Sequence, residues 1–178
     1  MKFLVLVGTV REGRKSVHAA REVCRAFSSR DHETRLFDLK EHDMPFLKNR
    51  RHRADDPDPE VEEFGQAVED SDAIVIVSPE YNHSIPGVLK NALDHLYPEY
   101  DDMPFSYVTV SGGGFGGVRS QSHLHDVTLA LGGHPGPDLA VSNVSDVFSE
   151  DGKLLDEDYR ERIDGFVERS GRHAEKFR

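Results

Sequence analysis

Residues 73–94 constrain the fold more than any other part of the chain. The run Ala73–Val77 is continuously apolar, which is typical of a parallel strand that helices cover on both faces. A polar turn follows, and Pro79 and Pro86 restrict its backbone before any ligand binds. A helix is predicted to start near Ile85, because proline in a first helical turn loses little hydrogen bonding. Ligands of open α/β sheets bind at such strand ends, so this turn is a candidate site.

The rest of the chain continues the alternation of strands and helices. Further strands are expected at about residues 2–7, 33–39, 105–110 and 138–143, and helices at about residues 16–28, 59–70, 85–96, 118–131 and 156–177. This alternation predicts an α/β three-layer sandwich around one five-stranded parallel sheet, with right-handed crossovers. Five strands fit the doubly wound order 2-1-3-4-5. Neither a repeat nor a linker divides the sequence, so we expect a single domain over residues 1–178.

In that strand order, the loops after the first, third and fourth strands meet at one edge of the sheet. The first loop carries the groups of an anion site. Thr9 and Ser16 can donate hydrogen bonds to phosphate oxygens, and Arg11 can add a charge-assisted bond. The helix that follows presents free N–H groups and the positive end of its dipole. The alternative is that Ser16 only caps the helix, and the two roles are compatible.

The same loop approaches the nucleoside-triphosphate motif G-x-x-x-x-G-K-[ST], with Gly8 and Gly13 followed by Lys15-Ser16. Arg14 intrudes, however, and puts the spacing off by one residue. The third strand also ends in Ser78-Pro79 rather than in a magnesium-binding aspartate. Both mismatches argue against an NTPase.

The loop Ser111–Gly117 has five glycines, and glycine allows the backbone to approach a flat ligand closely. It contains G-x-G-x-x-G after a strand and before a helix, with Asp138 downstream, which fits a dinucleotide fingerprint locally. So many glycines make a chance match easy, and the motif usually lies on the first strand rather than the fourth. A contact with a flat ring is the preferred interpretation.

The turn and helix at 78–94 resemble those of the NADPH-dependent FMN reductase family, flavodoxin-like enzymes that include quinone and azo-dye reductases. The matching positions are SPEYN at 78–82 and SIPGVLKNALD at 84–94. The first loop is similar to the phosphate-binding loop of this family, although His18 stands where asparagine is usual. The resemblance implies a flavodoxin-like fold and an FMN cofactor.

The resemblance also implies which residues bind FMN. The first loop would take the phosphate, and the turn after the third strand and the glycine-rich loop would take the ring. The N–H groups of Tyr81 and Asn82 are expected to donate to the pyrimidine oxygens, while Glu80 fixes the shape of the turn. The implied cofactor-binding residues are Thr9, Arg11, Ser16, Val17, His18, Pro79, Glu80, Tyr81, Asn82, Ser84, Ser111, Gly112, Gly113 and Gly116.

The chemistry implied is hydride transfer from NADPH or NADH to FMN, followed by reduction of a small-molecule acceptor such as a quinone, an azo compound, free flavin or a metal ion. The flavin would carry this chemistry, so no catalytic acid or base is assigned. A homodimer or homotetramer is implied as well. Two alternatives stay open: a flavodoxin-type electron carrier without NAD(P)H turnover, and a flavin-free regulatory or binding protein on the same fold.

Composition excludes several classes of protein. The 33 acidic and 22 basic residues give a net charge of −11, which argues against nucleic-acid binding. No apolar run approaches the roughly 20 residues that span a bilayer, so no membrane partner is expected. One cysteine, Cys24, excludes an internal disulfide and fits a reducing, cytoplasmic compartment. It falls on the apolar face of its helix, where a core position is predicted.

Other polar residues carry weaker indications. The ten histidines show no metal-ligand spacing, so no metal site is predicted. The basic cluster Lys48–Arg53 is either a solvated loop or a contact for the extra phosphate of NADPH. Lys90 and Asp94 lie one helical turn apart and are expected to pair.

Overall fold

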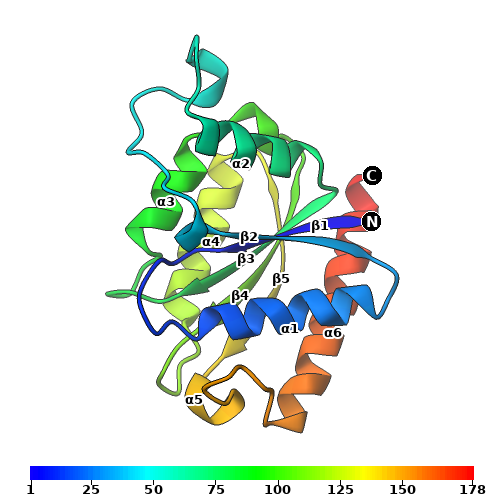
Figure 1. Cartoon of the computed structure of the whole chain (residues 1–178). Coiled ribbons are helices and arrows are strands. Elements are labelled where there is room, and N and C mark those ends of the chain that lie inside the picture. The colour runs from blue at the N-terminus through cyan, green and yellow to red at the C-terminus, as the bar shows by residue number, and fades with distance from the viewer.

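The computed structural model describes all 178 residues and contains one five-stranded parallel sheet with helices on both faces (Figure 1). Its strands are β1 (Lys2–Val7), β2 (Glu33–Asp38), β3 (Ala73–Pro79), β4 (Pro104–Val110) and β5 (His134–Val141). Their order in the sheet is β2-β1-β3-β4-β5, and every neighbouring pair is parallel. The predicted architecture and strand order are confirmed.

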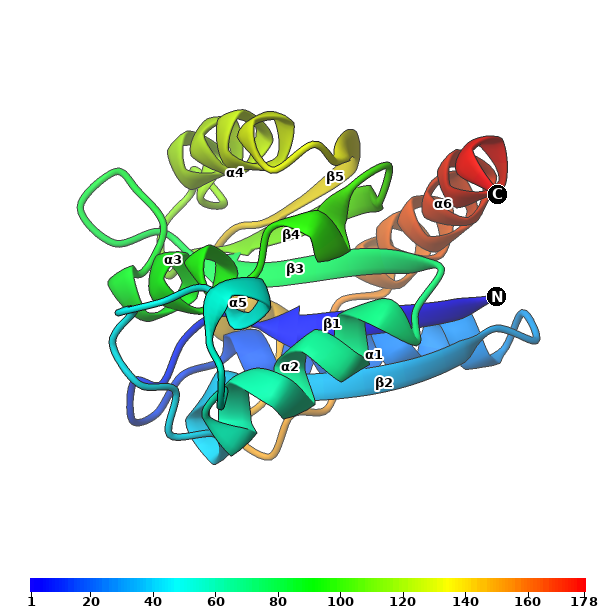
Figure 2. The same ribbon diagram turned by 90° about the horizontal axis from the view of Figure 1, so that it is seen from above.

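Two layers of helices enclose the sheet, as the two views in Figures 1 and 2 show. The six α-helices are α1 (Ser16–Ser28), α2 (Pro59–Glu69), α3 (Gly87–Asp94), α4 (Val118–Ala130), α5 (Val144–Val147) and α6 (Glu157–Ala174). Four short 3₁₀ turns are η1 (Leu39–Glu41), η2 (Arg51–Arg53), η3 (Pro98–Tyr100) and η4 (Glu175–Phe177). Helices α1 and α6 pack on one face of the sheet, and α2, α3 and α4 pack on the other. None of these helices combines the length and the apolar character that crossing a bilayer requires.

The core consists of two apolar clusters, one on each face of the sheet. Alternation along β1 divides its side chains between them: Phe3, Val5 and Val7 face α1 and α6, whereas Leu4 and Leu6 face α2 and α3. Both faces are therefore closed to a ligand, and the ends of the strands are the places where polar groups can meet one. Cys24 is partly buried against the first cluster, and burial raises the pKa of its thiol.

Several elements differ from their predicted bounds, and β5 and α3 differ where they begin. Strand β5 begins at His134, four residues before the expected start, because Pro135 and Pro137 hide it from a pattern search. Proline is tolerated there because β5 is an edge strand, and the ladder shifts register opposite Phe105–Tyr107. Helix α3 begins at Gly87, since Pro86 is still extended and serves as the N-cap.

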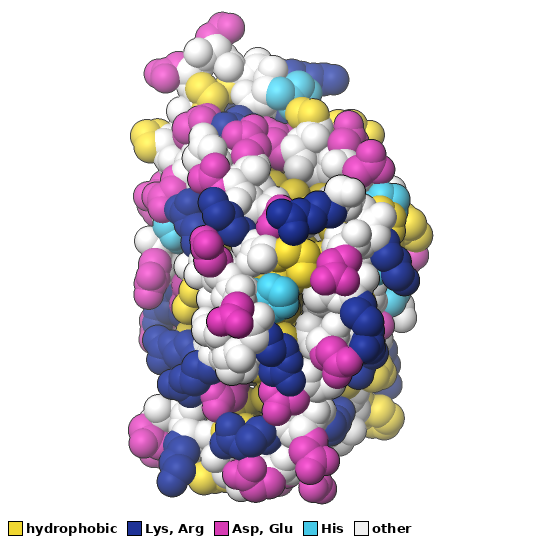
Figure 3. All heavy atoms as spheres, turned by 90° about the vertical axis from the view of Figure 1, so that its right-hand side faces the viewer, with side chains coloured by type: hydrophobic (Ala, Val, Ile, Leu, Met, Phe, Trp, Pro, Cys, Tyr) yellow, Lys and Arg dark blue, Asp and Glu magenta, His cyan; other side chains and the backbone are white.

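The two termini lie near each other at the edge of the sheet where the strands begin (Figures 1 and 2). A side chain added at Gly171 of α6 would come within 3.9 Å of Met1. The loops after the strands lie at the opposite edge. Figure 3 shows acidic and basic side chains interspersed over the face at the right-hand side of Figure 1, without a continuous basic patch on that face.

Arg51 anchors the irregular segment between β2 and α2. Its side chain is only 13% exposed, and it donates hydrogen bonds to three glutamates, Glu62, Glu69 and Glu99. These carboxylates raise the pKa of Arg51, and Arg51 in turn lowers the pKa of Glu62. The guanidinium lies on Gly65, where a Cβ atom would come within 2.5 Å of it. Of the basic cluster, Arg51 is thus engaged within the chain.

We expect Arg51→Ala to lower the free energy of unfolding by about 2–3 kcal/mol, because it leaves the nearly buried Glu99 without its charged partner. The lowered pKa of Glu62 stabilises the fold above its ordinary pKa, and that contribution is lost as the pH falls through the lowered value. Arg51→Ala should therefore also flatten the acid side of the stability profile. Urea denaturation from pH 3 to 7 measures both effects.

Arg53→Ala is the matched control, since Arg53 belongs to the same 3₁₀ turn but is exposed and makes no ion pair. It should change stability by no more than about 0.5 kcal/mol. Equal losses in the two variants would contradict an anchoring role for Arg51.

Candidate functional site

Three loops meet in a pocket of about 240 Å³ where β1, β3 and β4 end. The register that pairs Val7 with Val77 brings the first and second of these loops side by side, and Gly8 N–H donates to the Val77 carbonyl at 2.9 Å. Six of the predicted site residues line this pocket: Arg11, Ser16, Pro79, Tyr81, Ser111 and Gly112. The predicted convergence of the loops is observed.

The first turn of α1 faces this pocket with unpaired donors. Ser16 is 2% exposed, and its hydroxyl has no partner within the chain. The backbone N–H groups of Ser16 and Val17 are also unpaired, and no side chain caps the helix. Lys15 occupies the N-cap position, so the alternative of Ser16 as the cap is not what the structure shows. Unpaired donors at a helix N-terminus form a site that an anion can complete.

Arg14 adds a cation that the sequence analysis did not count among the residues of the anion site. Its largely buried guanidinium donates to the carboxylate of Asp38, at the end of β2. Its Nε and Nη1 atoms are buried without partners, and the side chain lines the pocket. The sequence did indicate this possibility, because Arg14 lies in the same loop as Arg11. The predicted strand order already put β2 beside β1, but the sequence did not show that Asp38, at the end of β2, pairs with Arg14.

A hydrogen bond joins the first loop to the second. The buried Thr9 hydroxyl lies 2.7 Å from the Tyr81 hydroxyl, and either oxygen can donate. The Arg11 N–H contacts the same Thr9 oxygen at 3.4 Å. Thr9 thus has a partner within the chain, and its contribution to the site is to hold Tyr81 against the first loop.

The turn after β3 is a tight hairpin. Tyr81 N–H donates to the Ser84 carbonyl at 2.9 Å, and Ser84 N–H returns a bond of 3.0 Å. Asn82 and His83 between them both have positive φ, at 51° and 65°, as a two-residue type I′ connection requires. The prediction that the Tyr81 N–H faces the ligand is therefore wrong, because that group closes the hairpin. The N–H groups of Asn82 and His83 are the unpaired ones.

Helix α4 holds this hairpin in place. Glu80 accepts hydrogen bonds from the Arg119 backbone at 3.2 Å and from its guanidinium at 3.3 Å, as expected for a residue that fixes the turn. The Ser84 hydroxyl lies 2.9 Å from Nδ1 of His123. Glu80 and Ser84 thus position the turn through these contacts, and neither lines the pocket.

The glycine-rich loop leaves room for a flat group. A Cβ atom built on Gly112 or on Gly113 would meet no atom within 4 Å. Gly116 has a different role: its φ is 62°, and a Cβ there would come within 2.7 Å of Ala140. The Ser111 hydroxyl donates to the Gly113 carbonyl at 2.7 Å and fixes the loop. Lys15 and helix α5 complete the lining of the pocket, with Lys15 Nζ 3.1 Å from the Ser145 hydroxyl. The sequence analysis did not predict this contribution of α5.

Two further predicted residues, Val17 and His18, also lie outside the pocket lining. Val17 is buried, with 9% of the residue exposed. The ring of His18 lies against Phe148, at 6.2 Å between centroids, and against the backbone of Gly152. Burial and the neighbouring cations lower the pKa of His18. Both residues adjoin the anion site through the backbone of the first helical turn.

The histidines include one cluster that sequence spacing did not indicate. His42, Glu60 and Glu63 place one potential ligand atom each within 4.8 Å of the others. His42 lies 2.7 Å from Glu60, and Glu63 accepts a bond of 2.9 Å from Arg35. Each of the three side chains is paired within the chain.

The fold and the pocket together define a flavodoxin-like protein with an anion site beside an opening for a flat ring. The sequence profile of the NADPH-dependent FMN reductases matches residues 1–146. The chain belongs to the NADPH-dependent FMN reductase family, and the resemblance read from its loops is confirmed.

Individual proteins agree with this assignment. An NAD(P)H:quinone oxidoreductase of Solanum tuberosum is 34% identical over 172 residues, which cover 92% of this chain and 87% of that protein. An NAD(P)H-dependent FMN reductase of Pseudomonas aeruginosa is 38% identical over 111 residues, covering 59% of this chain and only 60% of the relative. The solved flavoenzyme NAD(P)H:(acceptor) oxidoreductase FerB of Paracoccus denitrificans has the same fold, with a TM-score of 0.85, 24% identity and coverage of 99% and 98%.

We expect Tyr81→Phe to lower the free energy of unfolding by about 1 kcal/mol, because the buried Thr9 hydroxyl loses its partner. Thr9→Val removes the other half of the bond. A double-mutant cycle measured by urea denaturation should give clear non-additivity, since the two residues share one interaction. Additive losses would show that the bond contributes nothing.

His18 should make stability depend on pH. Its pKa is lowered in the folded state, so its contribution is complete above the ordinary value of about 6.5 and is lost as the pH falls from there toward the lowered value. His18→Asn removes this titration. The stability difference between wild type and variant should therefore shift in favour of the variant between pH 7 and pH 5, and a difference independent of pH would contradict the prediction.

Proposed function

We propose that the protein is an FMN-dependent NAD(P)H oxidoreductase that reduces a small-molecule acceptor, such as a quinone, an azo compound or a flavin. The observation that carries the proposal is the pocket where β1, β3 and β4 end. It combines the buried, unpaired Ser16 hydroxyl and free helical N–H groups with open space beside Gly112 and Gly113. Family membership supports the same reading.

The residues present fit FMN. The phosphate would be held by Arg11, by the Ser16 hydroxyl and by the first-turn N–H groups, with Arg14 supplying further positive charge. Tyr81 and Pro79 would border the ring, and the N–H groups of Asn82 and His83 are free to donate to its carbonyl oxygens. FMN held there would supply the redox chemistry, namely acceptance of a hydride from NAD(P)H and delivery of electrons to the acceptor. The protein's own part is to bind and orient, and no side chain is required as an acid or base.

Assembly and location belong to the same proposal. A homodimer or homotetramer is supported by exposed apolar side chains on α4, where Leu129 is 64% exposed and Val118 is 42% exposed. A cytoplasmic location is supported by the single reduced cysteine, Cys24.

The first experiment is the visible spectrum of the protein after incubation with FMN and desalting, before and after anaerobic NADPH. A bound flavin that bleaches with NADPH supports the reductase. A bound flavin that stays oxidised with NADPH and with NADH would favour a flavodoxin-type electron carrier. Absence of bound flavin would overturn the assignment of the pocket.

We expect Arg11→Ala to weaken FMN binding by about 1.5–3 kcal/mol, the value of a charged hydrogen bond. Quenching of flavin fluorescence during titration of the apoprotein measures the dissociation constant. Arg21→Ala is the control, since Arg21 is exposed on α1 outside the pocket and should leave the affinity unchanged. Unchanged affinity in Arg11→Ala would remove the phosphate-binding role.

A further inference from the structure

Phe46 is the most exposed apolar side chain of the protein, at 88%. It lies in the segment between η1 and η2, which connects β2 to α2. A large aromatic ring in water is unfavourable, because its burial would be worth about 1.5–3 kcal/mol. Single exposed apolar residues are common, so exposure alone assigns no role. In addition, the backbone on each side of Phe46 is held by hydrogen bonds.

That backbone is fixed by side chains of α3 and of the residue after it. The Asn91 amide accepts a hydrogen bond from Leu47 N–H at 3.0 Å and donates to the Pro45 carbonyl at 2.8 Å. His95, which is buried, reaches the same carbonyl with Nε2 at 2.8 Å. Both amide atoms of one asparagine thus hold the residues before and after Phe46. A fixed backbone presents the ring at little cost in conformational entropy when a partner binds.

The segment is also tied to the flavin edge of the sheet. Lys40 in η1 pairs with Glu12 of the first loop at 2.8 Å, and Asp38 just before it pairs with Arg14. Leu89 of α3 packs on Gly8, where a Cβ atom would come within 2.7 Å of the leucine. Helix α3 therefore contacts the first loop through Leu89 and the Phe46 segment through Asn91.

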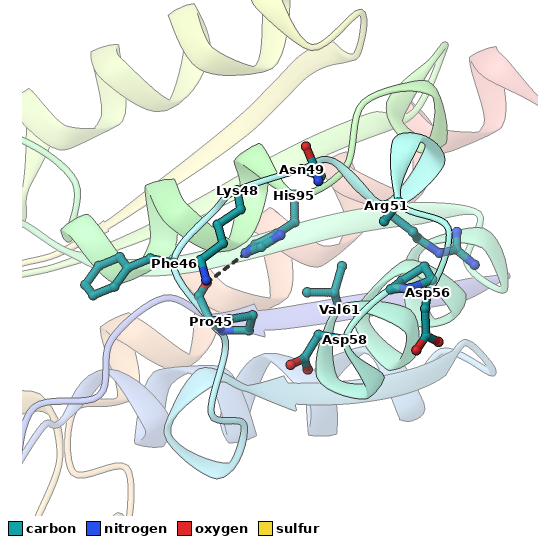
Figure 4. A pocket seen from close by; sticks show the side chains of 11 residues that line it. Pro45, Phe46, Lys48, Asn49, Arg51, Asp56, Asp58, Val61 and His95 are labelled. Atoms are coloured by element: carbon teal, nitrogen blue, oxygen red, sulfur yellow. Dashed lines mark hydrogen bonds between the residues drawn. The ribbon is translucent and has the colours of Figure 1, made fainter.

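Figure 4 shows where the ring points. The labelled side chains, among them Phe46, Arg51 and Val61, line a pocket of about 260 Å³. The Phe46 ring lies at the rim of this pocket and projects outward, toward the side on which β1 ends, which is the side of the FMN pocket. The ring is therefore presented at the same edge as the three loops and packs against none of them.

We propose that Phe46 is an acceptor-binding residue that stacks on planar aromatic electron acceptors at this edge. The inference rests on the proposed function. The FMN pocket is lined mainly by cations, hydroxyls and glycines, which hold a phosphate but offer a flat apolar acceptor little surface. An aromatic ring fixed in position supplies that surface, since offset stacking favours planar partners. Asn91 is the positioning residue, because it acts only through the backbone beside Phe46.

The test compares binding of a naphthoquinone to oxidised, FMN-loaded wild type, Phe46→Ala and Phe46→Tyr, followed by flavin fluorescence. We expect the dissociation constant to rise about tenfold in Phe46→Ala and to stay within twofold in Phe46→Tyr, which keeps the ring. The KM for the quinone in steady state should rise by the same factor. Reduction of ferricyanide, which is not planar and aromatic, should be unchanged. Because Phe46 is exposed, the variant is expected to fold.

Two further variants separate stacking from general effects. Phe177→Ala removes a partly exposed aromatic ring at the opposite edge of the sheet and should change no quinone constant. Asn91→Ala should weaken quinone binding about threefold, and the double variant with Phe46→Ala should be no weaker than Phe46→Ala alone. This non-additivity is expected only if Asn91 acts through Phe46.

An unchanged dissociation constant in Phe46→Ala would overturn the inference, and so would equal losses for quinone and ferricyanide. A Phe46→Ala variant that sediments as a smaller species than wild type would identify the ring as a subunit contact and would overturn it too. Failure of the proposed function is separate. If NADPH does not bleach wild-type flavin, the reductase assignment falls, while the quinone titration of the oxidised protein still decides the role of Phe46.

Discussion

Complete burial of β1 and β3 between two helical layers is the constraint on which the rest of the structure depends. The apolar side chains of both strands pack in the two core clusters, so neither face of the sheet is open to a polar ligand there. The pairing of Val7 with Val77 then decides that the first loop and the turn after β3 emerge side by side. Close packing of Leu89 on Gly8 fixes α3 against the same point. The location of the site follows from the packing of apolar residues.

Within that frame, the site combines rigid polar contacts with unpaired donors. Hydrogen bonds between Thr9 and Tyr81, and between Glu80 and Arg119, hold the loops before any ligand binds. The unpaired donors of Ser16 and Arg14 belong to the pocket that these loops line. The protein carries a net charge of −11, yet Arg11, Arg14 and Lys15 gather at this pocket. Local positive charge in an acidic protein favours an anion at one place and disfavours it over the rest of the surface.

The sequence predicted the fold well because both of its signals are local. Buried parallel strands are apolar runs, and the order of the elements limits the topology. It predicted which loops form the site but not each contact. Tyr81 N–H closes a hairpin whose two positive φ values depend on Asn82 and His83, and His18 turns toward Phe148. Arg14 depends on Asp38, and spacing along the chain does not reveal such a long-range pair.

The placement of the two chain ends has a practical consequence. Met1 lies beside α6 at the edge where the strands begin, and the candidate site lies at the edge where they end. A tether attached at either end would therefore leave the entrance of the pocket unobstructed. Covalent immobilisation on an electrode through one terminus would attach the molecule at the edge opposite the pocket. Fusion of a hydride-supplying dehydrogenase there would likewise place the added domain away from the pocket.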